Sequence, residues 1–188
     1  QCGGCYCLEL ATGKVLWEFW TDQWGEKQPV ASETMVVCQH DETLYCLESR
    51  SGRKISTISI GKTHTPRLLA GNVLIVTADQ EMRCMDARTG TILWRRTVHG
   101  QNPWFKFEAD AERVYVPTDQ GVRAFDLATG DQRWLFPITD MLPIQSSAVA
   151  DDYVYVVYGN VYCLDKKTGA VVWRYDPPEP ISLPRLSG

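Results

Sequence analysis

Cysteines at the start of the chain are the residues whose spacing first suggests chemistry. Cys2, Cys5 and Cys7 form a C-x-x-C-x-C cluster, and thiolates at such spacing can bind zinc. A zinc knuckle needs a second pair of ligands with similar spacing, and the sequence has none. Cys38 stands alone in a predicted strand. We therefore predict no metal site.

The histidines do not form a catalytic pattern. His40, His64 and His99 are far apart in the sequence. They lack the spacing of metal ligands and have no evident nucleophile as a partner. No catalytic residue is predicted.

An internal repeat positions most of the other residues of interest. Its turn glycines are Gly13, Gly52, Gly90, Gly130 and Gly169, at spacings of 39, 38, 40 and 39 residues. The aligned segments are YCLELATGKVLW from Tyr6, YCLESRSGRKIS from Tyr45, RCMDARTGTILW from Arg83, RAFDLATGDQRW from Arg123 and YCLDKKTGAVVW from Tyr162. Chance does not hold five motifs so close to one period.

Each position of the repeat has a physical role. Apolar alternation before the turn predicts a strand. The acid four residues before each glycine, and the hydroxyl directly before it, can accept hydrogen bonds from turn amides. The glycine supplies a positive φ. A tryptophan four residues later can pack on a neighbouring sheet, with its indole N–H seeking an acceptor; these are Trp17, Trp94, Trp134 and Trp173.

About 39 residues per unit fit four short antiparallel strands, the size of a propeller blade. Inner strands are predicted near 66–69, 105–109 and 146–150, and second strands at 34–38, 73–77, 114–117 and 153–157. The third strand ends at the acid and the fourth carries the tryptophan. The predicted fold class is all-β, a β-propeller of four-stranded antiparallel blades.

The motif resembles the pyrroloquinoline-quinone-like (PQQ-like) repeat, roughly Tyr-Ala-Leu-Asp-x-x-Thr-Gly-x-x-x-Trp. That repeat occurs in quinoprotein alcohol dehydrogenases, in the propeller lipoprotein of the outer-membrane assembly machinery and in sensor domains of kinases. The resemblance covers nearly the whole chain and implies a propeller with tryptophan docking. It does not imply one function, because the fold hosts several.

The repeats divide the 188 residues into a partial blade, four full blades and the start of another. The predicted bounds are 1–27, about 28–61, 62–100, 101–140 and 141–176, with a last strand at 181–188. Two alternatives stay open: an incomplete piece of a larger propeller, or a five-bladed ring. Open blades leave unpaired strand edges, which predict pairing with the remaining blades of the same propeller or a homo-oligomer.

Four cysteines occupy one repeat position, where small buried side chains are expected; they are Cys7, Cys46, Cys84 and Cys163. The total of seven is odd, which argues against a disulfide framework and favours the cytoplasm. The family resemblance instead implies the bacterial periplasm or an extracellular location.

Three tryptophans lie outside the repeat position. Trp20, Trp24 and Trp104 fall in predicted connections between an outer strand and the next inner strand, with His40, His64 and His99 near the same loop face. Loops on a rigid scaffold concentrate binding residues, and aromatic residues are enriched at interface hot spots. These six residues are the candidate partner-binding set; local capping of blade edges by the tryptophans is the alternative.

Net charge and hydrophobicity limit the classes of partner that we expect. The net charge of −4 gives no reason to expect nucleic acid, and no apolar run is long enough for a spanning helix. We expect a non-catalytic protein-interaction or scaffold module of a larger protein.

Two other functions stay open: a fragment of a PQQ- and calcium-binding quinoprotein dehydrogenase, and a ligand-sensing propeller of a signalling protein. The resemblance implies for such dehydrogenases a quinone over a central tryptophan, bound calcium and a disulfide between adjacent cysteines. The sequence has no adjacent cysteines and is too short for a complete dehydrogenase. We therefore expect no cofactor and no self-sufficient enzyme.

Overall fold

The computed structural model describes residues 3–21, 28–61, 65–78, 80–100, 106–138 and 146–178. Every regular element in these residues is a strand, and the strands are paired antiparallel. The predicted all-β class is confirmed. No helix in the described ranges is long and apolar enough to cross a membrane.

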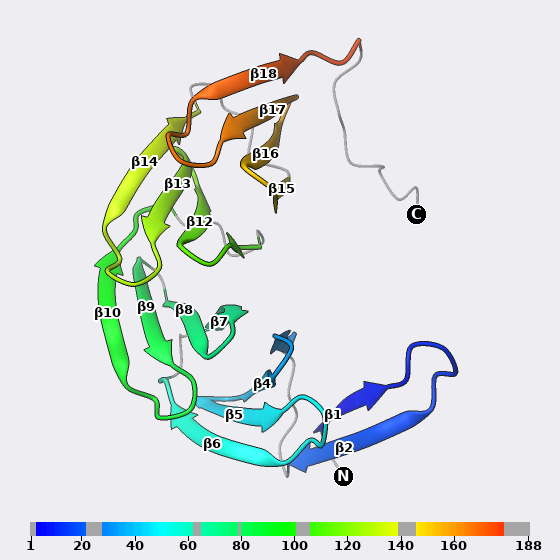
Figure 1. Ribbon diagram of the computed structural model, residues 1–188. Coiled ribbons are helices and arrows are strands. Elements are labelled where there is room, and N and C mark those ends of the chain that lie inside the picture. Colours follow the sequence, from blue (N-terminus) through cyan, green and yellow to red (C-terminus); the bar gives the residue numbers. More distant parts are fainter. Residues whose placement is uncertain are drawn as a thin grey trace, which may run out of the picture. The chain divides into compact units, whose positions relative to one another are not determined.

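The chain separates into two compact units, Gln1–Thr97 and Val98–Gly188. The first unit contains one two-stranded hairpin followed by two four-stranded sheets. Its strands are β1 (Gly3–Leu8), β2 (Val15–Thr21), β3 (Val30–Ala31), β4 (Met35–His40), β5 (Thr43–Glu48), β6 (Lys54–Ser59), β7 (Thr65–Ala70), β8 (Val73–Ala78), β9 (Glu81–Asp86) and β10 (Ile92–Thr97). Within this unit β2, β6 and β10 follow one another along one side (Figure 1).

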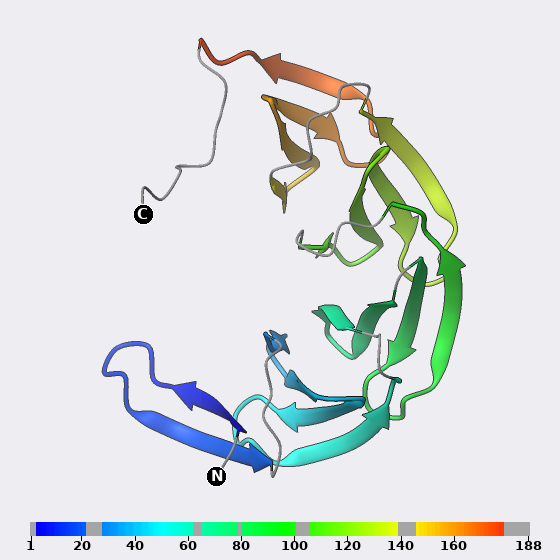
Figure 2. The same cartoon turned by 180° about the vertical axis from the view of Figure 1, so that it is seen from behind.

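The second unit contains two further four-stranded sheets, each with its strands side by side in chain order (Figure 2). Its strands are β11 (Glu108–Ala109), β12 (Arg113–Thr118), β13 (Gly121–Asp126), β14 (Gln132–Pro137), β15 (Ser146–Ala150), β16 (Tyr153–Tyr158), β17 (Asn160–Asp165) and β18 (Val171–Tyr175). Residues 181–188, predicted to begin another blade, lie outside the described residues.

Every hairpin between a third and a fourth strand is closed by the same backbone pattern. In the β5–β6 hairpin the Gly52 amide donates to the Glu48 carbonyl at 2.9 Å, and the Glu48 amide donates to the Arg53 carbonyl at 2.8 Å. The turn glycines have φ between 69° and 75°, a region that residues with a Cβ avoid. The predicted role of the glycines is confirmed.

The acid of the repeat secures the turn through its side chain. Asp86 Oδ1 accepts hydrogen bonds from the amides of Arg88 at 2.8 Å and Thr89 at 2.9 Å, and Asp126 and Asp165 make the equivalent pairs of bonds. Glu9 and Glu48 have longer side chains and accept from the hydroxyls of Thr12 and Ser51. The carboxylates of the motif are therefore engaged in holding the turns.

The hydrophobic cores lie between consecutive sheets. In the first unit Val37 and Cys46 of one sheet pack in one cluster with Leu74 and Met85 of the next. In the second unit Tyr115 and Phe136 share a cluster with Val154 and Leu164. Cys46, Cys84 and Cys163 are fully buried, as the repeat position predicted, whereas Cys7 on the first hairpin is only half-buried.

We predict that Gly52→Ala destabilises the chain more than Gly13→Ala. Both glycines have φ near 70°, so each substitution should cost about 1 kcal/mol for the backbone conformation. A Cβ on Gly52 would also lie 2.7 Å from the Trp17 ring, whereas one on Gly13 meets no described atom within 4 Å. The added overlap should bring the cost of Gly52→Ala to about 3 kcal/mol.

Urea unfolding of the two variants beside the unchanged chain measures this difference in the free energy of unfolding. Equal losses for the two alanine variants would show that the indole does not constrain the turn.

Candidate functional site

The six candidate partner-binding residues are not equally accessible in the structure. Trp24, His64 and Trp104 lie outside the described residues. His99 is exposed. Trp20, expected in a connection, instead lies inside strand β2, because the β1–β2 ladder extends to the pair Gly3–Thr21.

Trp20 is used in packing within its own hairpin. Its ring meets the edge of Tyr6 at a centroid distance of 5.2 Å, and a Cβ on the opposite residue Gly4 would lie 3.0 Å from the indole. This packing is local, as expected if the tryptophan caps a blade edge and does not bind a partner.

His40 is also engaged inside the first unit. It is 5% exposed, its Nδ1 lies 2.6 Å from Thr21 Oγ1, and its ring meets Tyr45 at 5.9 Å. The contact joins the ends of β2 and β4, so His40 links the first hairpin to the next sheet.

The best-defined polar contact between sheets involves the tryptophan of the repeat. Trp17 Nε1 donates to the Ser49 carbonyl at 2.8 Å, and Trp134 Nε1 donates to the Lys166 carbonyl at 3.0 Å. Each indole lies directly over the turn glycine of the next sheet, where a Cβ would come within 2.7 Å of the ring. Glycine is therefore required at this position for two reasons: its positive φ and the lack of a side chain that would collide with the indole.

A serine performs the same role where the second repeat lacks tryptophan. Ser56 Oγ donates to the Ala87 carbonyl at 2.7 Å, and Ala87 holds the turn position that corresponds to Ser49 and Lys166. Ile58, two residues later, approaches a Cβ placed on Gly90 to 3.3 Å. The gapless repeat alignment places Ser56 at the tryptophan position, but the sequence analysis did not predict that Ser56 would donate the hydrogen bond between the sheets.

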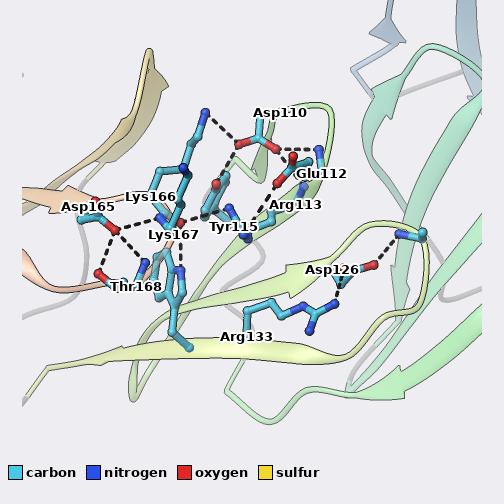
Figure 3. Close-up of polar contacts among 12 residues, drawn as sticks. Asp110, Glu112, Arg113, Tyr115, Asp126, Arg133, Asp165, Lys166, Lys167 and Thr168 are labelled. Atoms are coloured by element: carbon cyan, nitrogen blue, oxygen red, sulfur yellow. Dashed lines mark hydrogen bonds and ion pairs between the residues drawn. The ribbon is translucent and has the colours of Figure 1, made fainter.

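A polar network links the two sheets of the second unit (Figure 3). Asp110 Oδ1 accepts from the amides of Glu112 and Arg113, both at 2.8 Å. Its other oxygen accepts from the Tyr115 hydroxyl at 2.8 Å and lies 3.4 Å from Lys166 Nζ. Tyr115 is fully buried, so the network fixes a carboxylate at the junction of the sheets.

Lys166 connects this network to the turn of the following sheet. Its Nζ donates to the Asp151 carbonyl at 2.6 Å, while its own carbonyl accepts from Trp134 and, at 3.5 Å, from Arg113 Nη1. Burial raises the pKa of the Asp110 carboxyl, but the hydrogen bonds from Glu112, Tyr115 and Arg113 and the Lys166 charge together hold it below its usual value. The sequence analysis did not single out Asp110, Arg113 or Tyr115, because they lie outside the aligned repeat segments, and it assigned no role to Lys166 within its segment.

The turn aspartates are held as carboxylates. The Arg133 guanidinium, 2.6 Å from Asp126 Oδ2, and the Thr129 amide lower the pKa of Asp126 to about 2. Bonds from Thr89 lower the pKa of Asp86, and bonds from Thr168 lower that of Asp165. These charges stabilise turns.

One sheet leaves the equivalent tryptophan uncovered. Trp173 on β18 is 45% exposed, whereas Trp134 at the same repeat position is 7% exposed. Two residues later Tyr175 is 54% exposed, whereas Phe136 is 9% exposed. The face of β18 that carries Trp173 and Tyr175 therefore has the composition of a buried sheet face but lies open.

The first hairpin also exposes an apolar residue whose repeat equivalents are buried. Leu8 is 55% exposed, whereas its repeat equivalents Leu47 and Leu164 are fully buried. Leu47 packs against Trp17 of the preceding hairpin. Leu8 and the Gly13 turn thus present a surface that elsewhere in the chain receives a tryptophan.

No group of three or more His, Cys, Asp and Glu side chains among the described residues is placed to hold a metal ion. The carboxylates of the repeats face the amides and hydroxyls of their own turns, and no two cysteines are adjacent in the sequence.

A family model described as outer membrane protein assembly factor BamB matches residues 2–55 and 118–187. Two curated relatives are serine/threonine-protein kinases named AfsK. The one from Streptomyces griseus is 31% identical over 118 residues, 57% of this chain and 14% of the relative. The one from Streptomyces coelicolor is 27% identical over 158 residues, 79% of this chain and 19% of the relative. The chain spans less than a fifth of the length of these relatives.

Solved structures share the architecture at low sequence identity. BamB from Moraxella catarrhalis matches with a TM-score of 0.68 and 18% identity, over 86% of this chain and 56% of that chain. A europium-containing methanol dehydrogenase matches with a TM-score of 0.64 and 12% identity, over 96% of this chain and 48% of that chain. Both similarities concern the fold alone.

We predict that Trp134→Phe lowers the free energy of unfolding by about 2 kcal/mol, because it leaves the Lys166 carbonyl without its indole donor and opens space over Gly169. The same change at Trp173 should cost less than about 0.5 kcal/mol, because that ring is already half-exposed. Urea unfolding of the two variants provides the comparison. Similar costs at both positions would argue against the indole–carbonyl contact.

We predict that Asp126 contributes stability at neutral pH that is lost in acid. Its pKa in the folded chain, about 2, lies below the ordinary value of 3.8. The contribution is therefore complete above pH 3.8 and disappears as the pH falls through 2. The side-chain carbon resonance of Asp126 should titrate with a midpoint near 2, and Arg133→Ala should move that midpoint upward. A midpoint near 3.8 in the unchanged chain would contradict the ion pair.

Proposed function

Because the chain belongs to the family of PQQ-like β-propeller repeats, we propose that it is a non-catalytic protein-interaction or scaffold module of a larger protein. The observation that carries this proposal is the open apolar face of β18, where Trp173 and Tyr175 are exposed although their repeat equivalents are buried. A large exposed apolar surface on a folded protein marks an interaction site.

The partner of this face is a further PQQ-like blade. In the described contacts a side chain on the fourth strand of one sheet donates a hydrogen bond to a backbone carbonyl in the turn of the next sheet. The acceptor is the residue that directly follows the acid of the repeat: Ser49 for Trp17 and Lys166 for Trp134. Trp173 has the same repeat position and the same chemistry. A blade that presents a glycine turn therefore supplies the acceptor and the flat surface for tryptophan docking.

The chain itself contains a surface of that kind. Leu10 occupies the acceptor position of the first repeat and is fully exposed, and the neighbouring Gly13 turn has open space where a tryptophan ring lies in other repeats. A second copy can thus offer its Leu10–Gly13 turn to Trp173. Such head-to-tail contact between two different surfaces is heterologous.

The curated relatives support placement within a larger protein. The AfsK kinases are matched over 14% and 19% of their lengths, so most of each relative lies outside the similarity. Blades carried in a long chain are suited to presenting loops to a partner.

We predict that the purified chain associates with increasing concentration through β18. Tyr175→Lys places a charge on the face that carries Trp173 and should abolish association. Val172→Lys, a change of 51% exposed Val172 on the opposite face of the same strand, is the matched control and should leave association unchanged. Sedimentation velocity over a range of concentrations measures the mass.

A chain that stays monomeric at every concentration, or that responds equally to both lysine variants, would overturn this role of β18. In the same samples PQQ with Ca²⁺ should leave the midpoint of thermal unfolding unchanged. An upward shift of that midpoint would instead support the quinoprotein alternative.

A ligand-sensing module of a signalling protein is the second candidate, favoured by the similarity to the AfsK kinases. The encoding gene distinguishes the two candidates. A kinase catalytic domain in the same reading frame would support sensing, whereas a reading frame composed of propeller repeats alone would favour the scaffold.

A further inference from the structure

Two cysteines from separate sheets meet inside the first unit. Cys5 lies on β1 and Cys38 lies on β4. Cys38 belongs to the buried cluster with Trp17 and Leu47, and Cys5 packs against that cluster, so that the two thiols are near enough to shift each other's pKa. The contact crosses from the first hairpin to the next sheet, between residues that are distant in the sequence.

The two thiols differ in access and in acidity. Cys5 is half-buried near the surface, whereas Cys38 is 5% exposed. The hydrogen bond from Cys38 lowers the pKa of Cys5, and the same bond together with burial raises the pKa of Cys38. An accessible thiol with a lowered pKa beside a buried second thiol is the arrangement of a redox-sensing pair.

The other described cysteines are placed differently. Cys7 joins the same cluster two residues along β1 and is therefore the closest competitor of Cys5. Cys46 belongs to the neighbouring core and is fully buried. Burial raises its pKa. Cys84 and Cys163 are fully buried in other sheets.

We propose that Cys5 and Cys38 form a reversible disulfide when the chain meets a hydroperoxide, fastening the β1–β2 hairpin to the sheet β3–β6. The Cys5 thiolate attacks one peroxide oxygen, so that an S–O bond forms, the O–O bond breaks and hydroxide leaves. Cys38 then attacks the Cys5 sulfur, so that the S–S bond forms, the S–O bond breaks and hydroxide leaves with the Cys38 proton as water. Two thiols lose two electrons, and hydrogen peroxide is reduced to two molecules of water.

The linkage has a structural consequence for the first hairpin. A two-stranded hairpin is barely stable by itself in water, and this one is held by the Trp17 and His40 contacts with the next sheet. A covalent bond between β1 and β4 would keep the hairpin attached when those contacts open. It also closes a long loop, which restricts the unfolded chain. This inference does not depend on the proposed function.

Peptide mapping tests the pair. The purified chain is treated with a small excess of hydrogen peroxide, alkylated and digested. We expect a peptide that joins Cys5 to Cys38, about 2 Da lighter than the two reduced peptides together, and its loss after dithiothreitol. Cys7→Ser is the matched control and should keep the linked peptide. Cys5→Ser and Cys38→Ala should abolish it.

Two further measurements separate the pair from incidental oxidation. In Cys38→Ala the sulfenic acid on Cys5 should persist and be trapped by dimedone, because the resolving thiol is missing. The oxidised chain should unfold several degrees higher than the reduced chain, a shift that Cys7→Ser should retain. A disulfide that uses Cys2 or Cys7 in place of Cys5, or Cys46 in place of Cys38, or no linked peptide at all, would overturn the proposal.

Discussion

The bond from a fourth-strand donor to a carbonyl in the next turn is the interaction on which the arrangement of the sheets depends. Trp17 reaches the Ser49 carbonyl and Trp134 reaches the Lys166 carbonyl. Each bond satisfies two polar groups at a partly buried junction, where an unpaired donor or acceptor would be costly. The indole also covers the turn glycine, so one residue supplies both the hydrogen bond and the packing between the sheets.

This contact explains how the polar residues of the repeat are used. The carboxylates hold the turns that expose the acceptor carbonyls, and their lowered pKa values follow from the amides and cations that surround them. The apolar face of β18, which has the composition of a buried sheet face, is exposed, and this exposure supports the proposed interaction module.

Residues that differ from one repeat to the next change the contacts at individual junctions between neighbouring sheets. Ser56 replaces an indole with a hydroxyl and keeps the donor, while Ile58 provides the packing over Gly90. At the junction in the second unit Lys166 adds contacts with Asp110 and with the Asp151 carbonyl. At the first hairpin the thiols of Cys5 and Cys38 meet, and there the junction gains a group that can be oxidised. The hydrogen bond from the fourth strand to the next turn holds neighbouring sheets together, and the residues that differ between repeats add further contacts at each junction.

The sequence by itself determined the strands, the turns and the blade architecture, because the repeat places glycine, acid and alternating apolar residues by rules that act over a few residues. It also placed Cys46, Cys84 and Cys163 in the core. It misplaced Trp20, which continues strand β2, since only the pairing of Thr21 with Gly3 sets the length of that ladder. The tertiary structure decided which groups meet across sheets: His40 with Thr21, Lys166 with Asp110, and Cys5 with Cys38. Those contacts join residues 19 to 56 positions apart, and spacing along a chain does not specify which side chains face one another across two packed sheets.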